Sequence, residues 1–206
     1  MTLAAWLSLF AVCLLGAVSP GPSLAVVMRA TIGGGQPAGL RAAIAHGAGV
    51  GLYGLLTVTG LAVLLTRSPA LFLALQVSGA LYLLWLGAKS LLARGAATAT
   101  EAEVQASQNP ATEGFLVALL NPKLAVFMIA LFSQFLAPEF GMKEKAIMVA
   151  TVGITDAAWY GLVAVLIARP AFLARLRASE VAVNRAFGVI LIALALTVIA
   201  NALLNQ

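Results

Sequence analysis

Residues 3–28 read LAAWLSLFAVCLLGAVSPGPSLAVVM, and this stretch decides the kind of fold. It contains no charged residue, and it exceeds the ~20 apolar residues that a helix needs to cross a lipid bilayer. Pro20-Gly21-Pro22 lies inside it. Because proline lacks a backbone N–H and its ring clashes with the carbonyl four residues earlier, we expect a membrane-spanning helix that breaks within the bilayer.

The composition of the whole chain agrees with a lipid environment. Of the 206 residues, 62% are apolar and only 9% are charged, whereas a soluble domain has about 25% charged residues. The net charge of +5 does not indicate nucleic-acid binding, because the basic residues form no cluster. The single cysteine, Cys13, excludes a CxxC redox pair, and we expect it to be a packing residue. No Lys or Arg precedes the first apolar run, which favours a mature helix over a signal peptide.

Five further apolar segments are long enough to span a bilayer. They are residues 42–65, 70–88, 114–137, 146–168 and 186–204. Connectors are expected at 33–37, 66–69, 93–113, 138–145 and 169–185. The predicted fold class is therefore an all-α integral membrane protein with six transmembrane helices. It comprises a three-helix half at 1–92, a polar linker at 93–113 and a second three-helix half at 114–206.

The basic residues predict the orientation in the membrane. Eight of them lie in or beside the first, third and fifth connectors, and three lie on the opposite side. Cytoplasmic loops of membrane proteins carry an excess of Lys and Arg. We therefore expect the odd-numbered loops to be cytoplasmic and both termini to lie outside.

The two halves share short sequence patterns. Residues 22–28 read PSLAVVM and residues 122–128 read PKLAVFM, and both begin at a proline in the first helix of their half. The middle helix of each half contains Tyr-Gly-Leu, at 53–55 and at 160–162. Three spans per half turn the second copy upside down relative to the first. This is the inverted-repeat organisation of many secondary transporters.

A second proline break is expected in the fourth segment, at Asn121-Pro122-Lys123. Broken helices leave backbone groups that hydrocarbon cannot satisfy, so those groups must face protein or a water-filled cavity. The exposed N–H groups at the helix starts near Ser23 and Lys123 carry partial positive charge and would attract a carboxylate. Simple proline kinks that serve only packing are the alternative.

Two strong charges lie within the predicted spans, Lys123 and Asp156. A charge at mid-bilayer costs about 2.5–3.5 kcal/mol on insertion scales. Asp156 is therefore expected to line the transport pathway, as a proton carrier or as the counter-ion of an ammonium group. The alternative is an ion pair, with Lys123 as the partner, that only fixes packing. An acid that attracts an amine and helix starts that attract a carboxylate together fit a zwitterion such as an amino acid.

Several other polar and aromatic residues are candidates for the same pathway. Trp159 and Tyr160 follow Asp156 at helical spacing, where aromatic rings could hold a cationic amine; the alternative is ordinary packing. His46 and Tyr53 share a face of the second helix, and His46 is either a proton relay or a hydrogen-bonded structural residue. The remaining candidate is Gln134, late in the fourth helix. Gly47 and Gly51 form a GxxxG pair, which favours close helix packing.

The chain resembles the LysE/RhtB family of bacterial amino acid exporters. The matching pieces are SPGPSLAVVM at 19–28, GALYLLWLGAKSLL at 79–92, GFLVALLNPKLAVFMIALFSQFL at 114–136 and Asp-x-x-Trp-Tyr at 156–160. The resemblance implies a homodimeric protein of the bacterial inner membrane that exports an amino acid or a derivative, driven by the proton motive force. The motif prolines of the family carry over onto Pro20, Pro22 and Pro122, its asparagine onto Asn121 and its acid onto Asp156.

The predicted function is therefore proton-coupled export of an amino acid, with protons and the lipid bilayer as its other partners and no cofactor. The alternative is efflux of a divalent metal cation. Such a site would need several converging ligands, and only His46, Asp156 and Cys13 lie within the spans. An enzyme is not expected, because the chain has neither CxxC nor HExxH to support redox or zinc-protease chemistry.

Overall fold

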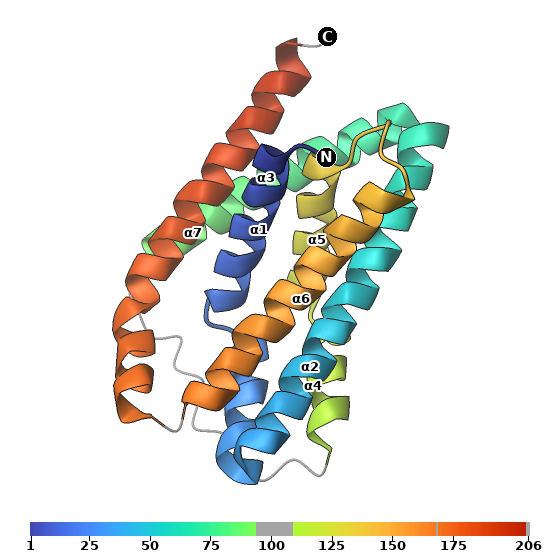
Figure 1. The fold of residues 1–206 in the computed structure, drawn as a ribbon. Helices are drawn as coiled ribbons and strands as arrows, with labels where there is room; N and C mark the ends of the chain where they lie inside the picture. Colours follow the sequence, from blue (N-terminus) through green and yellow to red (C-terminus); the bar gives the residue numbers. More distant parts are fainter. Residues whose placement is uncertain (94–108, 168, 205–206) are drawn as a thin grey trace.

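The computed structural model describes residues 1–93, 109–167 and 169–204, and these form seven α-helices and no strand (Figure 1). The helices are α1 (Leu3–Val18), α2 (Pro22–Arg67), α3 (Pro69–Leu92), α4 (Pro110–Leu120), α5 (Pro122–Phe135), α6 (Met142–Leu166) and α7 (Pro170–Leu204). The predicted all-α class is confirmed for these residues.

Most of the helices are long and apolar enough to cross a membrane. By length and composition, α2, α3, α6 and residues 178–202 of α7 each qualify, and α4 and α5 qualify together as one bent span. The angle between α4 and α5 is 58°. The shorter α1 is also apolar. The protein is thus a multi-pass membrane protein.

Both predicted proline breaks are present. Helix α1 ends at Val18, and α2 begins at Pro22. Helix α4 ends at Leu120, and α5 begins at Pro122. Each proline occupies the first turn of the new helix, where its missing N–H would have no intrahelical partner in any case.

Two predicted connectors turn out to be helical. Residues 33–37 lie within α2, where only Gly35 leaves the helical region, with φ 77°, a conformation that glycine adopts without steric cost. The chain reverses direction there, and the rest of α2 rises beside α6 (Figure 1). Residues 170–185 belong to α7, because their Ala, Leu and Arg residues are good helix formers whatever their polarity. Of the predicted linker, residues 94–108 lie outside the described residues, and α4 begins at Pro110.

Glycines set the closest helix contacts. A Cβ on Gly47 of α2 would lie 2.8 Å from the carbonyl oxygen of Gly153 of α6, and a Cβ on Gly153 would lie 3.1 Å from that of Gly47. Gly87 of α3 and Gly188 of α7 meet in the same reciprocal way, at 2.8 and 2.6 Å. Absent side chains let the backbones approach closely. The packing role expected for Gly47 is thus confirmed.

Helices α1 and α5 lie at the centre of the molecule, as the contacts between helices show. Helix α2 packs most extensively against α6 and α4, and α3 packs against α7 and α5, while α1 lies against α6 and α7. Leu9 of α1 and Phe132 of α5 are fully buried in the main apolar core. The two helix breaks therefore lie in the interior, between the outer helices.

Candidate functional site

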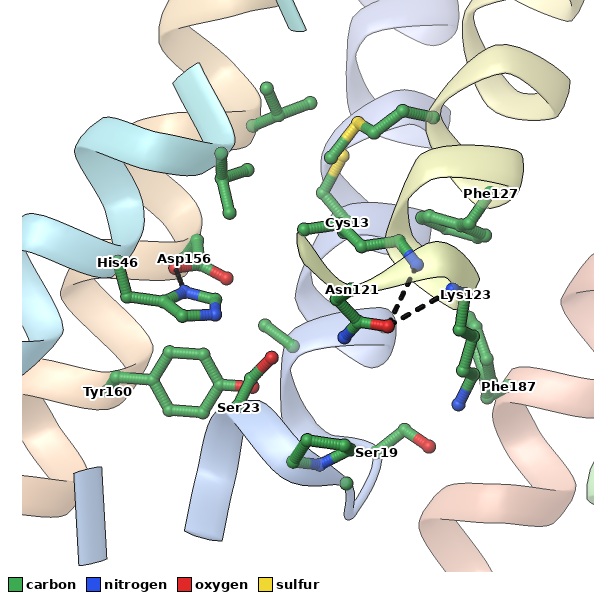
Figure 2. A pocket seen from close by; sticks show the side chains of 18 of the residues that line it. Cys13, Ser19, Ser23, His46, Asn121, Lys123, Phe127, Asp156, Tyr160 and Phe187 are labelled. Atoms are coloured by element: carbon green, nitrogen blue, oxygen red, sulfur yellow. Dashed lines mark hydrogen bonds and ion pairs between the residues drawn. The ribbon is translucent and has the colours of Figure 1, made fainter. Parts of the chain in front are cut away.

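One cavity lies where the two helix breaks come together (Figure 2). The α1–α2 break contributes Ser19, Gly21, Pro22 and Ser23, and the α4–α5 break contributes Asn121 and Lys123. The other lining residues are Cys13, Gly16, Ala17, His46, Val50, Leu86, Leu124, Phe127, Met128, Val152, Asp156, Tyr160 and Phe187. The cavity volume of about 80 Å³ holds several waters, since one water needs about 10–15 Å³ on this measure.

The start of α2 presents uncapped backbone N–H groups at this cavity. Its N-cap residue is Gly21, and no side chain caps the helix. Pro22 has no N–H, so the first free donors belong to Ser23 and Leu24, because the N–H of Ala25 is already bonded to the carbonyl of Gly21. The N-terminus of a helix carries partial positive charge and attracts anions. This half of the expectation from the sequence is met.

The start of α5 differs from the expectation. The Asn121 side-chain oxygen accepts hydrogen bonds from the N–H groups of Lys123, at 3.1 Å, and of Leu124, at 3.3 Å (Figure 2). Asparagine is among the best N-cap residues. The free N–H groups predicted at this break are therefore occupied. The positive charge offered here is the Lys123 side chain, which lines the cavity.

Asp156 is paired with His46. The Asp156 Oδ2 atom lies 2.6 Å from His46 Nδ1, and both side chains are buried. The partner of Asp156 is therefore His46 and not Lys123. Gly47 explains the pairing, because its hydrogen-only side chain lets α2 approach Gly153 and Ala157 of α6 and places the neighbouring His46 opposite Asp156.

His46 has a second ring nitrogen that is free. Its Nε2 atom is buried and has no hydrogen-bond partner among the described residues. The Tyr160 ring packs edge-on against the imidazole, with centroids 5.2 Å apart and an interplanar angle of 81°. In Figure 2, His46, Asp156 and Tyr160 stand on one side of the cavity, and Asn121, Lys123, Phe127 and Phe187 stand on the other. The cavity is thus polar at two opposed walls.

The other predicted site residues lie away from this cavity. Trp159 packs in a second apolar cluster beside Leu24, Tyr53 packs against the main core, and neither lines the cavity. Gln134 donates hydrogen bonds to the carbonyl of Gln76 and to the hydroxyl of Ser133, so it links α5 to α3. Pro20 and Pro122 form the breaks but do not line the cavity.

Several lining residues were not predicted as site residues. Phe127 comes four residues after Lys123 on the same helix face, so its position could have been read from the sequence. Phe187 and Leu86 come from α7 and α3, and no local pattern points to them. Cys13 was expected to pack, and it is buried but also lines the cavity.

The residues present do not form a metal site. Cys13, His46 and Asp156 all line the cavity, but across the described residues no three His, Cys, Asp or Glu side chains gather closely enough to hold a metal ion. Nothing in the described structure favours the metal-efflux alternative.

The chain matches the model of a known protein family. The family model described as "LysE type translocator" matches residues 14–202. The chain belongs to this family. The matched range contains both helix breaks, Asp156, His46 and every lining residue except Cys13. The resemblance inferred from the sequence motifs is confirmed, and membership places the chain among translocators rather than enzymes.

Individual relatives match over parts of their length. A leucine efflux protein of Klebsiella pneumoniae is 36% identical over 45% of this chain and 43% of its own length. A leucine efflux protein of an Enterobacter species is 40% identical over 35% and 34%. An uncharacterised membrane protein of Pseudomonas aeruginosa is 35% identical over 65% and 64%. The chain thus matches less than half of the two leucine efflux proteins. No solved structure matches this LysE-type translocator.

Proposed function

We propose that this LysE-type translocator exports an amino acid or a close derivative from the cytoplasm in exchange for protons. One observation carries the proposal. One cavity presents a carboxylate, Asp156, on one wall and a cation, Lys123, on the other, with the uncapped start of α2 between them. These are the two opposite charges that a zwitterion needs.

The cavity also has an apolar surface that would contact the third part of an amino acid, its side chain. Phe127, Phe187 and Leu86 line it, and its described lining residues include no carboxylate besides Asp156 that could bind a basic side chain. An apolar side chain would bury its surface against these rings at about 25 cal/mol per Å². Two partial matches are named leucine efflux proteins, which supports an apolar substrate.

The proposed cycle uses six spans in two inverted halves, residues 1–92 and 114–206, joined by the segment 93–113. In this arrangement α1 with the start of α2 corresponds to α4 with α5. The reciprocal glycine contacts of α2 with α6 and of α3 with α7 support it, because mutual contacts of this kind arise around a two-fold axis. Rocking of the halves about the cavity would expose it to each side in turn.

In the exchange, the substrate carboxylate binds Lys123 and the N–H groups of α2, and its ammonium binds the Asp156–His46 pair. After release outside, the pair takes up a proton and returns. We propose that the protein works as a homodimer in the bacterial inner membrane, with its odd-numbered loops in the cytoplasm.

The test is efflux from cells and vesicles. Cells that overexpress the protein are challenged with single amino acids and dipeptides, and resistance to an apolar amino acid is expected. In vesicles loaded with L-leucine, Asp156→Asn should reduce efflux driven by a pH gradient by at least about tenfold, since the ammonium and His46 lose a charged partner and a hydrogen bond to a charged group contributes about 1.5–3 kcal/mol. The matched control is Thr57→Val, on the same helix as His46 but outside the cavity. Wild-type efflux by Asp156→Asn would refute the proposed role.

A further inference from the structure

We propose that the proton exchanged for substrate is carried by the imidazole of His46, at Nε2, and that Asp156 stays ionised throughout the cycle. This inference rests on the proposed function and assigns its proton to one atom. The observation behind it is the orientation of the buried His46 ring, which has one nitrogen bonded to Asp156 and the other unpartnered at the cavity.

The carboxylate fixes the tautomer of the ring. Because Asp156 Oδ2 lies 2.6 Å from Nδ1, the Nδ1–H donates to the carboxylate, as in the pairs that orient histidines elsewhere. The proton that the ring gains and loses is then the one on Nε2. Within the part of the chain that the structure describes, that atom has no partner although the side chain is only 1% exposed. Leaving a buried polar atom unpaired is costly, so a cavity water or a substrate is its natural partner.

Chemistry also places the extra proton on the histidine. When the pair holds one more proton than the carboxylate–imidazole state, that proton goes to the more basic group, and imidazole is ordinarily far more basic than a carboxylate. The resulting imidazolium keeps a charge-assisted hydrogen bond to Asp156. A buried carboxylate without such a partner would be costly.

The other titratable groups at the cavity come from three helices. They are Cys13 on α1, Lys123 on α5 and Tyr160 on α6. Thiol and phenol groups are ordinarily neutral near pH 7, and an ammonium is ordinarily charged. Among the side chains that the structure describes, helices α3 and α7 contribute the apolar Leu86 and Phe187 to the cavity. Imidazole is the one side-chain type among these that ordinarily gains and loses a proton near cellular pH.

The exchange step balances as a single proton transfer. On the cytoplasmic side the imidazolium Nε2–H bond breaks, the proton passes to a cavity water, and the Nε2 lone pair accepts a hydrogen bond from the substrate ammonium. On the outer side the ammonium leaves and Nε2 takes a proton from water. One proton enters for each substrate that leaves. Because a zwitterion has no net charge, one positive charge moves inward in each cycle.

The first experiment compares two modes of transport in proteoliposomes with radiolabelled L-leucine. Leucine–leucine exchange needs no return of a proton-loaded carrier, whereas net efflux driven by a pH gradient does. For His46→Gln we expect slower leucine exchange, because one substrate contact is lost, and a further loss of net efflux, so that the ratio of net efflux to exchange falls about 100-fold relative to wild type, the low end of what a proton-transfer group contributes. Thr57→Val should match wild type in both modes. Proton-driven net efflux by His46→Gln at the wild-type rate overturns the assignment.

The second experiment measures protons released on binding, so it does not depend on transport. L-leucine is added to purified protein in weakly buffered detergent solution near pH 6.5, the ordinary titration point of histidine. Wild type should release a proton on binding, and His46→Gln should release none at leucine concentrations raised to saturate its weakened binding. Asp156→Asn should still release a proton over some part of the pH range. If Asp156→Asn binds leucine with no release at any pH, Asp156 carries the proton and the assignment is wrong.

These outcomes are separable from failure of the proposed function. If wild type neither binds nor exchanges L-leucine or any other amino acid, the exporter proposal itself fails. If wild type exchanges an amino acid, and both wild type and His46→Gln release a proton on binding, the exporter proposal holds. In that case the assignment of the proton to His46 is wrong.

Discussion

At the scale of single residues, the cavity separates binding from coupling. Lys123 faces the cavity from one wall, and the Asp156–His46 pair faces it from the other. A zwitterion that spans the space between them would meet a cation with its carboxylate and an anion with its ammonium. Each wall should then contribute a different measurable quantity, affinity at Lys123 and proton coupling at His46.

Lys123→Gln should weaken the binding of the substrate carboxylate. A hydrogen bond to a charged group contributes about 1.5–3 kcal/mol, so we expect the KM of efflux to rise at least about tenfold. The matched control is Lys143→Gln, because Lys143 is exposed and lies outside the cavity. The concentration dependence of leucine efflux measures both. An unchanged KM in Lys123→Gln would show that the substrate carboxylate does not bind Lys123.

Asn121→Ala should destabilise the protein through the start of α5. The Asn121 oxygen holds two backbone N–H groups, and loss of an N-cap costs about 1 kcal/mol. Thermal unfolding in detergent should show a lower Tm for Asn121→Ala. Asn121→Ser should recover most of the loss, because serine caps almost as well. Equal Tm values for Asn121→Ala and wild type would contradict this role.

Sequence reasoning reached some of these residues and missed others. The proline breaks and the deep Asp156 were predictable, because a missing N–H and a charge in lipid have local causes. The partner of Asp156 was not, since His46 is 110 positions away in the sequence and the pairing depends on how α2 packs on α6. The Asn121 cap could have been predicted from its residue type alone.

At the scale of helices, the close approach of α2 to α6 determines whether the site exists. A Cβ on Gly47 would lie 2.5 Å from the Ala157 Cβ and 2.8 Å from the Gly153 carbonyl oxygen. Since backbone atoms must then move, the two helices would separate beside the His46–Asp156 contact. The glycine is therefore part of the site although it binds nothing.

Gly47→Ala should consequently lower both stability and transport. Overpacking of a tight contact costs about 1–3 kcal/mol, and the displaced His46 would lose its bond to Asp156. Gly60→Ala is the matched control, because a Cβ on Gly60 of the same helix meets nothing within 4 Å. Tm and pH-driven efflux report the two effects. A Gly47→Ala protein that matches Gly60→Ala in both would show that the close approach is not required.

At the scale of the whole molecule, the ends of the helices predict the topology. Met1 and the end of α7 lie at the same end of the molecule, and the chain reversal at Gly35 lies at the other (Figure 1). This arrangement agrees with an even number of spans. The long apolar helices α2, α3 and α6 could be predicted from the sequence because apolar length is a local property, whereas the helical state of residues 170–185 was hidden by their polarity.

Reporter fusions should show both termini outside. Alkaline phosphatase, which is active only outside the cytoplasm, should be active when fused before residue 1 or after residue 206 and inactive when inserted in 93–113. The physical basis is the excess of basic residues at the odd-numbered loops. If alkaline phosphatase is active in the 93–113 insertion and inactive in both terminal fusions, the protein has the opposite orientation in the membrane.

The central claim is that one cavity exchanges an amino acid for a proton. The most direct measurement is simultaneous recording of leucine efflux and internal pH in proteoliposomes that contain the purified protein. The account predicts that leucine leaves against its gradient when the outside is acidic, with one proton entering per leucine, and that His46→Gln uncouples the two. Leucine efflux that proceeds at the same rate without a pH gradient and moves no protons would contradict it.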